Sequence, residues 1–186
     1  MMRDARLLRG RAPFRESAML VQEPVAALSR LPLLLGRLAG LADVQLRTRP
    51  PGEYFSLLEQ VCHLRDIEVE GYSRRLALLL EQDHPELPDL DGATLAKARN
   101  YNEQELAPAL AAFTAARAAN LAHLKTLQKS DLSRSGHLEH VGEVTVARLL
   151  ELWVAHDREH AQEIERLLAS LRDPARPPKA SRSLAT

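Results

Sequence analysis

The stretch VARLLELWVAHDREHAQEIERLLASL, residues 146–171, decides the fold. Its apolar residues recur every three or four positions, and this spacing predicts one long amphipathic helix. Thr145 is a good N-cap for the helix, which is expected to end near Leu171, ahead of Asp173 and Pro174. Other long helices in the chain would complete a helical bundle.

Two histidines, His156 and His160, stand four residues apart in this helix and therefore lie on one face, one turn apart. Six apolar residues, Trp153 and Ile164 among them, lie within roughly 80° of His156 on the helix. Both imidazoles are thus predicted to point into the apolar interior of the bundle, where an unpaired polar ring costs free energy. They are either hydrogen-bonded core histidines or ligands of a metal ion, and their spacing suits both interpretations.

The rest of the chain of 186 residues has the same helical spacing, abundant Ala and Leu, few aromatic residues and no β-branched runs. It predicts an all-α four-helix bundle with short extra helices in the connections. Ser56 and Glu59 form a capping-box pattern at the start of the second helix, and Pro32 should break the first. The connection Ser130–Val144 is expected to be polar. The helices are expected over Pro24–Leu41, Ser56–Glu81, Ala93–Asn100 (short), Glu105–Leu127 and Val146–Leu171.

We expect one domain, residues 24–172, with an N-terminal extension at 1–23, partly helical or flexible, and a disordered tail at 173–186. Lys and Arg total 25 and so do Asp and Glu, which leaves no surplus charge to attract nucleic acid or an anionic membrane. The single cysteine, Cys62, excludes an intramolecular disulfide. No apolar run has the length of a membrane span or a signal peptide, so a cytoplasmic protein is expected.

A third histidine, His63, lies in the predicted helix 56–81. Glu59, Asp66 and Glu70 fall within roughly 60° of His63 on the helix. Such a strip of charged residues usually faces solvent, but a carboxylate can also orient a histidine that binds a metal. If the two helices meet here, His63, His156 and His160 provide three nitrogen ligands and leave an open position, as catalytic metal sites do. Metal affinity should then fall as pH drops through about 6.5. Surface positions are expected for His84, His123, His137 and His140.

Three stretches resemble the DinB-like superfamily, whose members share a metal-binding four-helix bundle. Their order and separation, over Val25–Leu171, carry the likeness more than any single motif does. Tyr54 departs mildly from the family, which often has tryptophan there. The stretches are Pro51–Ser56 followed by Glu59 and His63–Glu68, then Arg99–Glu103, and finally Gly142–Thr145 followed by His156–Ile164.

The resemblance implies that His63, His156 and His160 bind a divalent ion, commonly nickel, zinc or iron. It also implies a homodimer, and some relatives are transferases or isomerases that use a low-molecular-weight thiol. One hypothesis is therefore a metal-dependent hydrolase or thiol-dependent S-transferase for an unidentified small-molecule substrate. Asp66, Glu59 or Glu70 would act in it as base or as partner of a ligand. The alternative hypothesis is a non-catalytic helical bundle that binds a small ligand or a protein partner, in which the histidines are structural.

Overall fold

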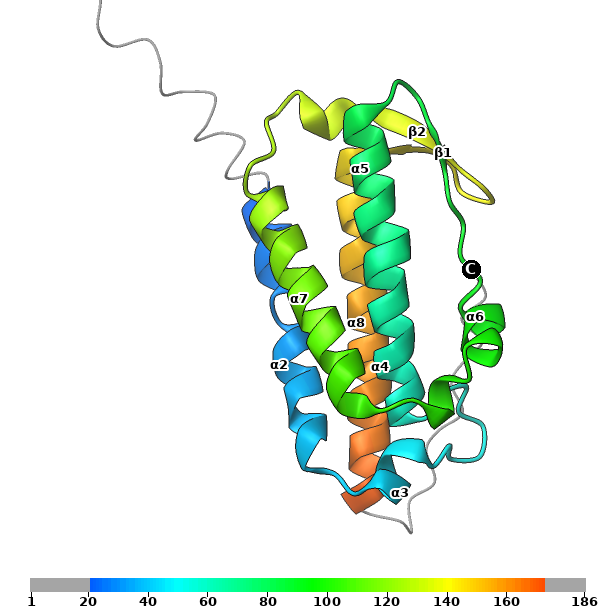
Figure 1. Ribbon diagram of the computed structural model, residues 1–186. Coiled ribbons are helices and arrows are strands. Elements are labelled where there is room, and N and C mark those ends of the chain that lie inside the picture. Colours follow the sequence, from blue (N-terminus) through cyan, green and yellow to red (C-terminus); the bar gives the residue numbers. More distant parts are fainter. Residues whose placement is uncertain (1–20, 173–186) are drawn as a thin grey trace, which may run out of the picture.

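Four helical segments run along the long axis of the molecule in the computed structural model, which describes residues 21–172 (Figure 1). The predicted all-α bundle is confirmed, whereas the expectations for residues 1–20 and 173–186 fall outside the described part. The first segment comprises residues 21–28 and α2 (Leu31–Gly36), and the second is α4 (Leu57–Asp66), η2 (Ile67–Ser73) and α5 (Arg74–Glu81) in unbroken succession. The third and fourth are α7 (Leu106–Leu124) and α8 (Val146–Arg172).

The helix limits follow the local signals in the sequence. The first segment breaks at Ser29 and Arg30, directly before the turn of α2 that contains Pro32. Ser56 and Glu59 form the expected capping box, in which each side chain accepts a hydrogen bond from the other residue's backbone N–H. The hydroxyl of Thr145 accepts from the backbone N–H of Arg148 in the first turn of α8.

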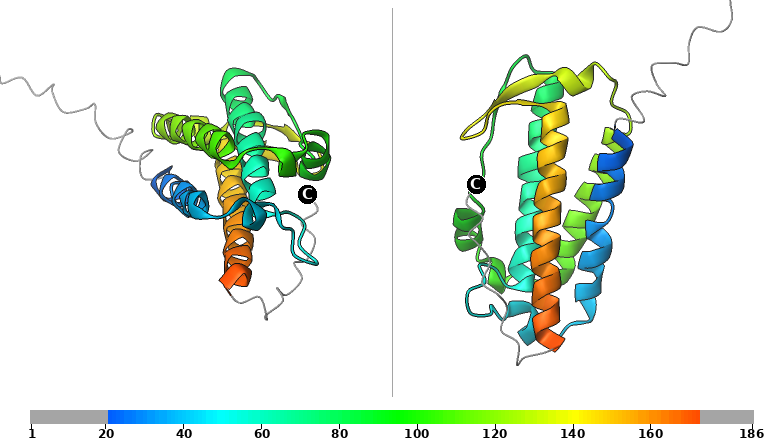
Figure 2. Two further views of the ribbon diagram at one scale, coloured as in Figure 1. Left: turned by 60° about the horizontal axis from the view of Figure 1, so that its bottom comes forward. Right: turned by 180° about the vertical axis from the view of Figure 1, so that it is seen from behind.

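The connections carry short helices, as predicted. η1 (Arg37–Gly40) and α3 (Asp43–Arg47) follow α2, while α6 (Gly92–Ala98) and η3 (Tyr101–Glu103) lie between α5 and α7. The chain around α6 runs beside α4, on the side that faces away from α7 (Figure 2). We call residues 88–101 the strap. No helix in the described range 21–172 is long and apolar enough to cross a membrane.

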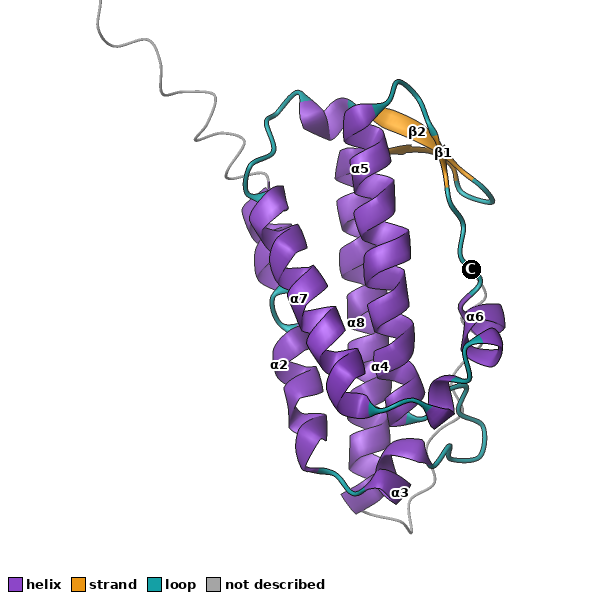
Figure 3. Ribbon diagram, viewed as in Figure 1, coloured by secondary structure: helices purple, strands orange, loops and turns teal. Residues whose placement is uncertain are grey.

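The sequence did not predict the small sheet at one end of the bundle (Figure 3). β2 (Ser135–Leu138) follows η4 (Asp131–Ser133) and pairs antiparallel with β3 (Gly142–Thr145) and parallel with β1 (Glu86–Leu87). The strands are too short for a period-two pattern to show. Their pairing depends on tertiary contacts, because Leu87, Leu138 and Val144 are buried in the core beneath them.

A polar layer divides the core into two apolar clusters. One cluster lies at the sheet end and contains Trp153, and the other lies at the opposite end and contains Phe113. Between them the guanidinium of Arg117, 1% exposed, donates to the carboxylates of Glu68 and Asp157. The layer thus joins α7, η2 and α8 through one buried cation.

The second helix contains a wide turn that the sequence did not predict, because η2 is a π-helix. The hydroxyl of Ser73 donates to the backbone oxygen of Glu68 at 2.6 Å, and Asn120 donates to both side chains at 2.7 Å. These contacts link the wide turn to α7, and π turns commonly occur at functional sites. The wide turn begins four residues after His63.

Candidate metal centre

The three predicted histidines converge between α4 and α8. The ring of His63 lies 4.7 Å from that of His160 and 5.5 Å from that of His156, and the two rings of α8 are 4.4 Å apart, all between centroids. One ligand nitrogen from each ring lies within 4.8 Å of the other two. His63 and His160 are buried and His156 is partly buried. The geometry is therefore compact enough for one ion to reach all three.

Burial keeps these imidazoles neutral. It lowers the pKa of His63 to about 4, an effect that the nearby carboxylate of Asp66 only partly opposes. Burial lowers the pKa of His160 to about 3, with repulsion from His63 as a further cause, and it lowers that of His156 well below 6.5. A neutral imidazole has the free lone pair that a metal requires. The rings consequently need not lose protons to bind an ion at neutral pH.

Two of the nitrogens in the cluster have no hydrogen-bond partner. These are Nδ1 of His63 and Nδ1 of His156, the only such buried side-chain atoms among residues 21–172. A buried polar atom without a partner costs about 1–3 kcal/mol, so two of them in one cluster call for a functional reason. Three neutral imidazole nitrogens within 4.8 Å of one another are a donor set that fits zinc, nickel or iron.

Gln60 orients the third ring, a role that the sequence analysis missed. The amide nitrogen of Gln60 donates to Glu163 at 2.7 Å, so its oxygen faces Nδ1 of His160 at 2.6 Å. An amide oxygen can only accept, which places the proton of His160 on Nδ1 and leaves Nε2 free for a metal. Gln60 and Glu163 each stand three residues from a histidine, on the same helix face, and that spacing was an available signal.

The three carboxylates that were predicted near His63 are all engaged with arginines. Glu59 pairs with Arg49 and caps α4, and Glu70 pairs with Arg99. Burial alone would raise the pKa of Asp66, but hydrogen bonds from Arg65, Tyr101 and Arg99 outweigh it and lower that pKa. These ion pairs favour positioning over proton transfer for the three carboxylates.

Aromatic side chains line the cluster on two sides. Phe55 lies 5.3 Å from the ring of His63, and Tyr72 lies 5.6 Å from that of His156. Tyr72 also stacks on Trp153 and donates to the backbone oxygen of Leu152. The apolar walls lower the local dielectric, which strengthens any charge interaction in the site. The other four histidines are exposed, as predicted.

Comparison with known proteins gives one family and one fold. A family model of the DinB superfamily matches residues 30–164. A solved structure from Bacillus subtilis, YfiT, aligns with a TM-score of 0.65 at 21% identity, over 91% of this chain and 93% of that one. It is described as a probable metal-dependent hydrolase with an unusual four-helix bundle topology. No curated protein matches the chain.

Proposed function

Because the chain belongs to the DinB superfamily, we propose that it is a metal-dependent enzyme in which His63, His156 and His160 hold one divalent ion. The observation that carries the proposal is the convergence of three neutral imidazoles from two helices, two of them buried and one partly buried, with unpartnered nitrogens on two of the rings. When bound, the ion would supply Lewis acidity and activate a water for attack on a polarised substrate. Three protein ligands leave room for that chemistry, whereas a structural site is closed by four.

The residues around the histidines define what the chain itself contributes. Gln60 and Glu163 set the tautomer and the orientation of His160. Phe55 and Tyr72 limit the access of bulk water to the rings and offer apolar contacts to a substrate. Hydrolysis is the reaction that we propose, supported by the description of YfiT as a probable metal-dependent hydrolase and by the shared fold.

Thiol transfer remains a prediction from the family resemblance. A thiol would be deprotonated by the same ion, but Cys62 is buried against Tyr101 and Gln104 and is not the source of one. The expectations of a homodimer and of a cytoplasmic location stay predictions as well.

The metal content of protein purified without a histidine tag tests the proposal. We expect about one equivalent of zinc, nickel or iron in the wild type and almost none in His156→Ala, with unchanged far-UV circular dichroism. His123→Ala is the matched control, because His123 is an exposed histidine in α7. The metal-loaded wild type should hydrolyse members of a panel of simple esters, amides and phosphate esters, and chelation should abolish that activity.

Two results would refute the proposal. Wild-type protein that contains no metal and gains no thermal stability from added Zn²⁺ or Ni²⁺ would favour the non-catalytic bundle with structural histidines. Stoichiometric metal that persists in His156→Ala would place the ion elsewhere.

A further inference from the structure

The strap is attached to the second helix at both ends of α6. Before α6, Arg75 donates to the backbone oxygen of Pro88 at 2.8 Å, and Leu90 packs against Gly71 in η2. The side chain of Asp91 then caps α6 by accepting from the backbone N–H of Ala93 at 2.9 Å. The position at which α6 begins, relative to the second helix, is therefore set by contacts outside the histidine cluster.

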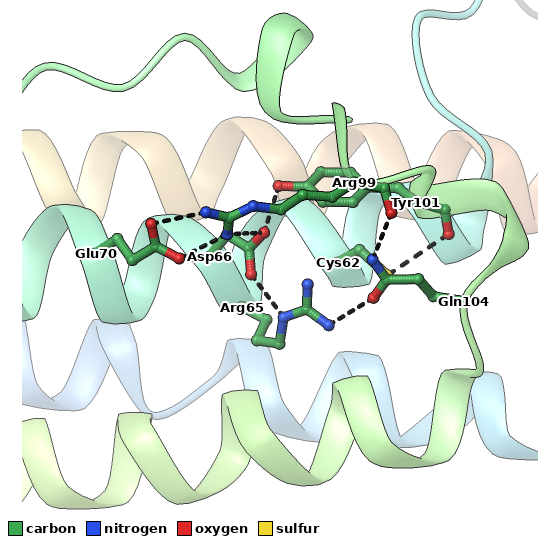
Figure 4. Close-up of polar contacts among 7 residues, drawn as sticks. All are labelled: Cys62, Arg65, Asp66, Glu70, Arg99, Tyr101 and Gln104. Carbon is green, nitrogen blue, oxygen red and sulfur yellow. Dashed lines mark hydrogen bonds and ion pairs between the residues drawn. The ribbon is translucent and has the colours of Figure 1, made fainter. Parts of the chain in front are cut away.

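After α6 the attachment is ionic (Figure 4). Arg99 forms a bidentate pair with Glu70 and also donates to Asp66 at 2.7 Å. The hydroxyl of Tyr101 donates to the same carboxylate at 2.6 Å. Asp66 and Glu70 thus have a role that their place on the strip of His63 did not reveal: they fix the strap across α4.

Between these attachments, Gly92 lies directly against the imidazole of His63. A Cβ at residue 92 would lie 2.5 Å from Cε1 and 2.8 Å from Nδ1 of that ring. Contacts this short do not occur between real side chains, so a larger residue would have to move the ring or lift the strap. The backbone does not require glycine here, because Gly52 and Gly142 are the only glycines of residues 21–172 with positive φ. The reason for glycine at 92 is therefore the space that the ring occupies.

The geometry points to Gly92 as a positioning residue for the ligand His63, with the strap as the support that presses its backbone against the ring. This inference rests on the proposed metal site. The backbone of Gly92 limits the rotation of the imidazole about its side-chain bonds and keeps it turned toward His156 and His160. Metal affinity depends on such restraint, because a ligand that is already oriented loses less entropy on binding.

The substitution Gly92→Ala tests the inference, with Gly36→Ala as the matched control. Gly36 also lies in a short helix, and a Cβ added there meets nothing within 4 Å. Titration with Zn²⁺ in competition with a chelator should show at least a tenfold weaker Kd for Gly92→Ala than for wild type, which is about 1.4 kcal/mol. Gly36→Ala should bind like wild type. Equal Kd values for wild type and Gly92→Ala would overturn the positioning role.

A double-mutant cycle checks the contact without metal. In the apo protein, Gly92→Ala should lower the Tm by about 2–10 °C, the effect of an overpacked methyl group in a chain of this size. In a His63→Ala background the same substitution should leave the Tm unchanged, because the ring that it meets is gone. An equal loss in both backgrounds would show that the alanine acts on something other than His63 and would refute the inference.

The two proposals fail in different ways. Wild-type protein that binds no Zn²⁺ refutes the metal site itself. Wild-type protein that binds Zn²⁺ while Gly92→Ala retains its Kd refutes only the role of Gly92.

Discussion

Replacing Arg117 by methionine should destabilise the protein by about 3–5 kcal/mol at pH 7.5, the usual effect of removing one partner from a buried ion pair. Methionine has a similar length, so the change removes the charge and the hydrogen bonds more than the volume. The guanidinium donates to Glu68, to Asp157 and to the backbone oxygen of Leu28, and all these contacts are lost. Glu68 keeps donors in Asn120 and Trp153.

Asp157 explains why the cost is high. Burial raises its pKa to about 6 even though Arg117 opposes the shift. Without the arginine the folded-state pKa must rise further above the unfolded value of 3.8. A carboxyl group with a raised folded-state pKa stabilises the protein below the unfolded pKa, and that contribution is lost as pH rises through the folded pKa. The deficit of Arg117→Met relative to wild type should therefore shrink between pH 7.5 and pH 5.5.

Urea unfolding followed by circular dichroism, with EDTA present, measures the effect at both pH values. Arg148→Met is the control, because Arg148 pairs with Glu151 on the exposed face of α8 and should contribute less than about 0.5 kcal/mol. A loss for Arg117→Met below about 1 kcal/mol at pH 7.5, or a deficit that grows as pH falls, would refute the reasoning. Asp157→Asn added to Arg117→Met should recover part of the loss, since it removes the stranded charge.

Two further predictions concern the histidines. Gln60→Leu should weaken Zn²⁺ binding by about 10–100-fold, because His160 loses the hydrogen-bond acceptor that sets its tautomer. Gln162→Leu is the control: Gln162 is exposed on α8, and its replacement should leave the Kd for Zn²⁺ unchanged in the same titration. Calorimetry at pH 6.0 in buffers of different ionisation enthalpy should detect almost no protons released from the imidazoles on Zn²⁺ binding, since burial lowers the pKa of His63 to about 4 and that of His160 to about 3. Release of about two protons would contradict those pKa values and restore the unshifted 6.5 of the sequence analysis.

Local signals in the sequence were enough to predict the helices and the shared face of His156 and His160 on α8. Three such signals are the capping box at Ser56, the N-cap at Thr145 and the break before Pro32. Each depends on residues within one helical turn, so the amino-acid sequence alone reveals it. His156 and His160 share a face for the same reason, since helical geometry alone brings residues four apart together.

Tertiary structure decided how the helices use these residues. His160 meets Gln60 across 100 positions of sequence, and Arg117 meets Glu68 across 49 and Asp157 across 40. The pairing of the short strands and the contact of the His63 ring with Gly92 also join segments that pack together only in the folded chain. Periodicity specifies which face of a helix is apolar, but it carries no information on which distant side chain will fill the space opposite. That choice is made by packing and by the need to pair every buried charge.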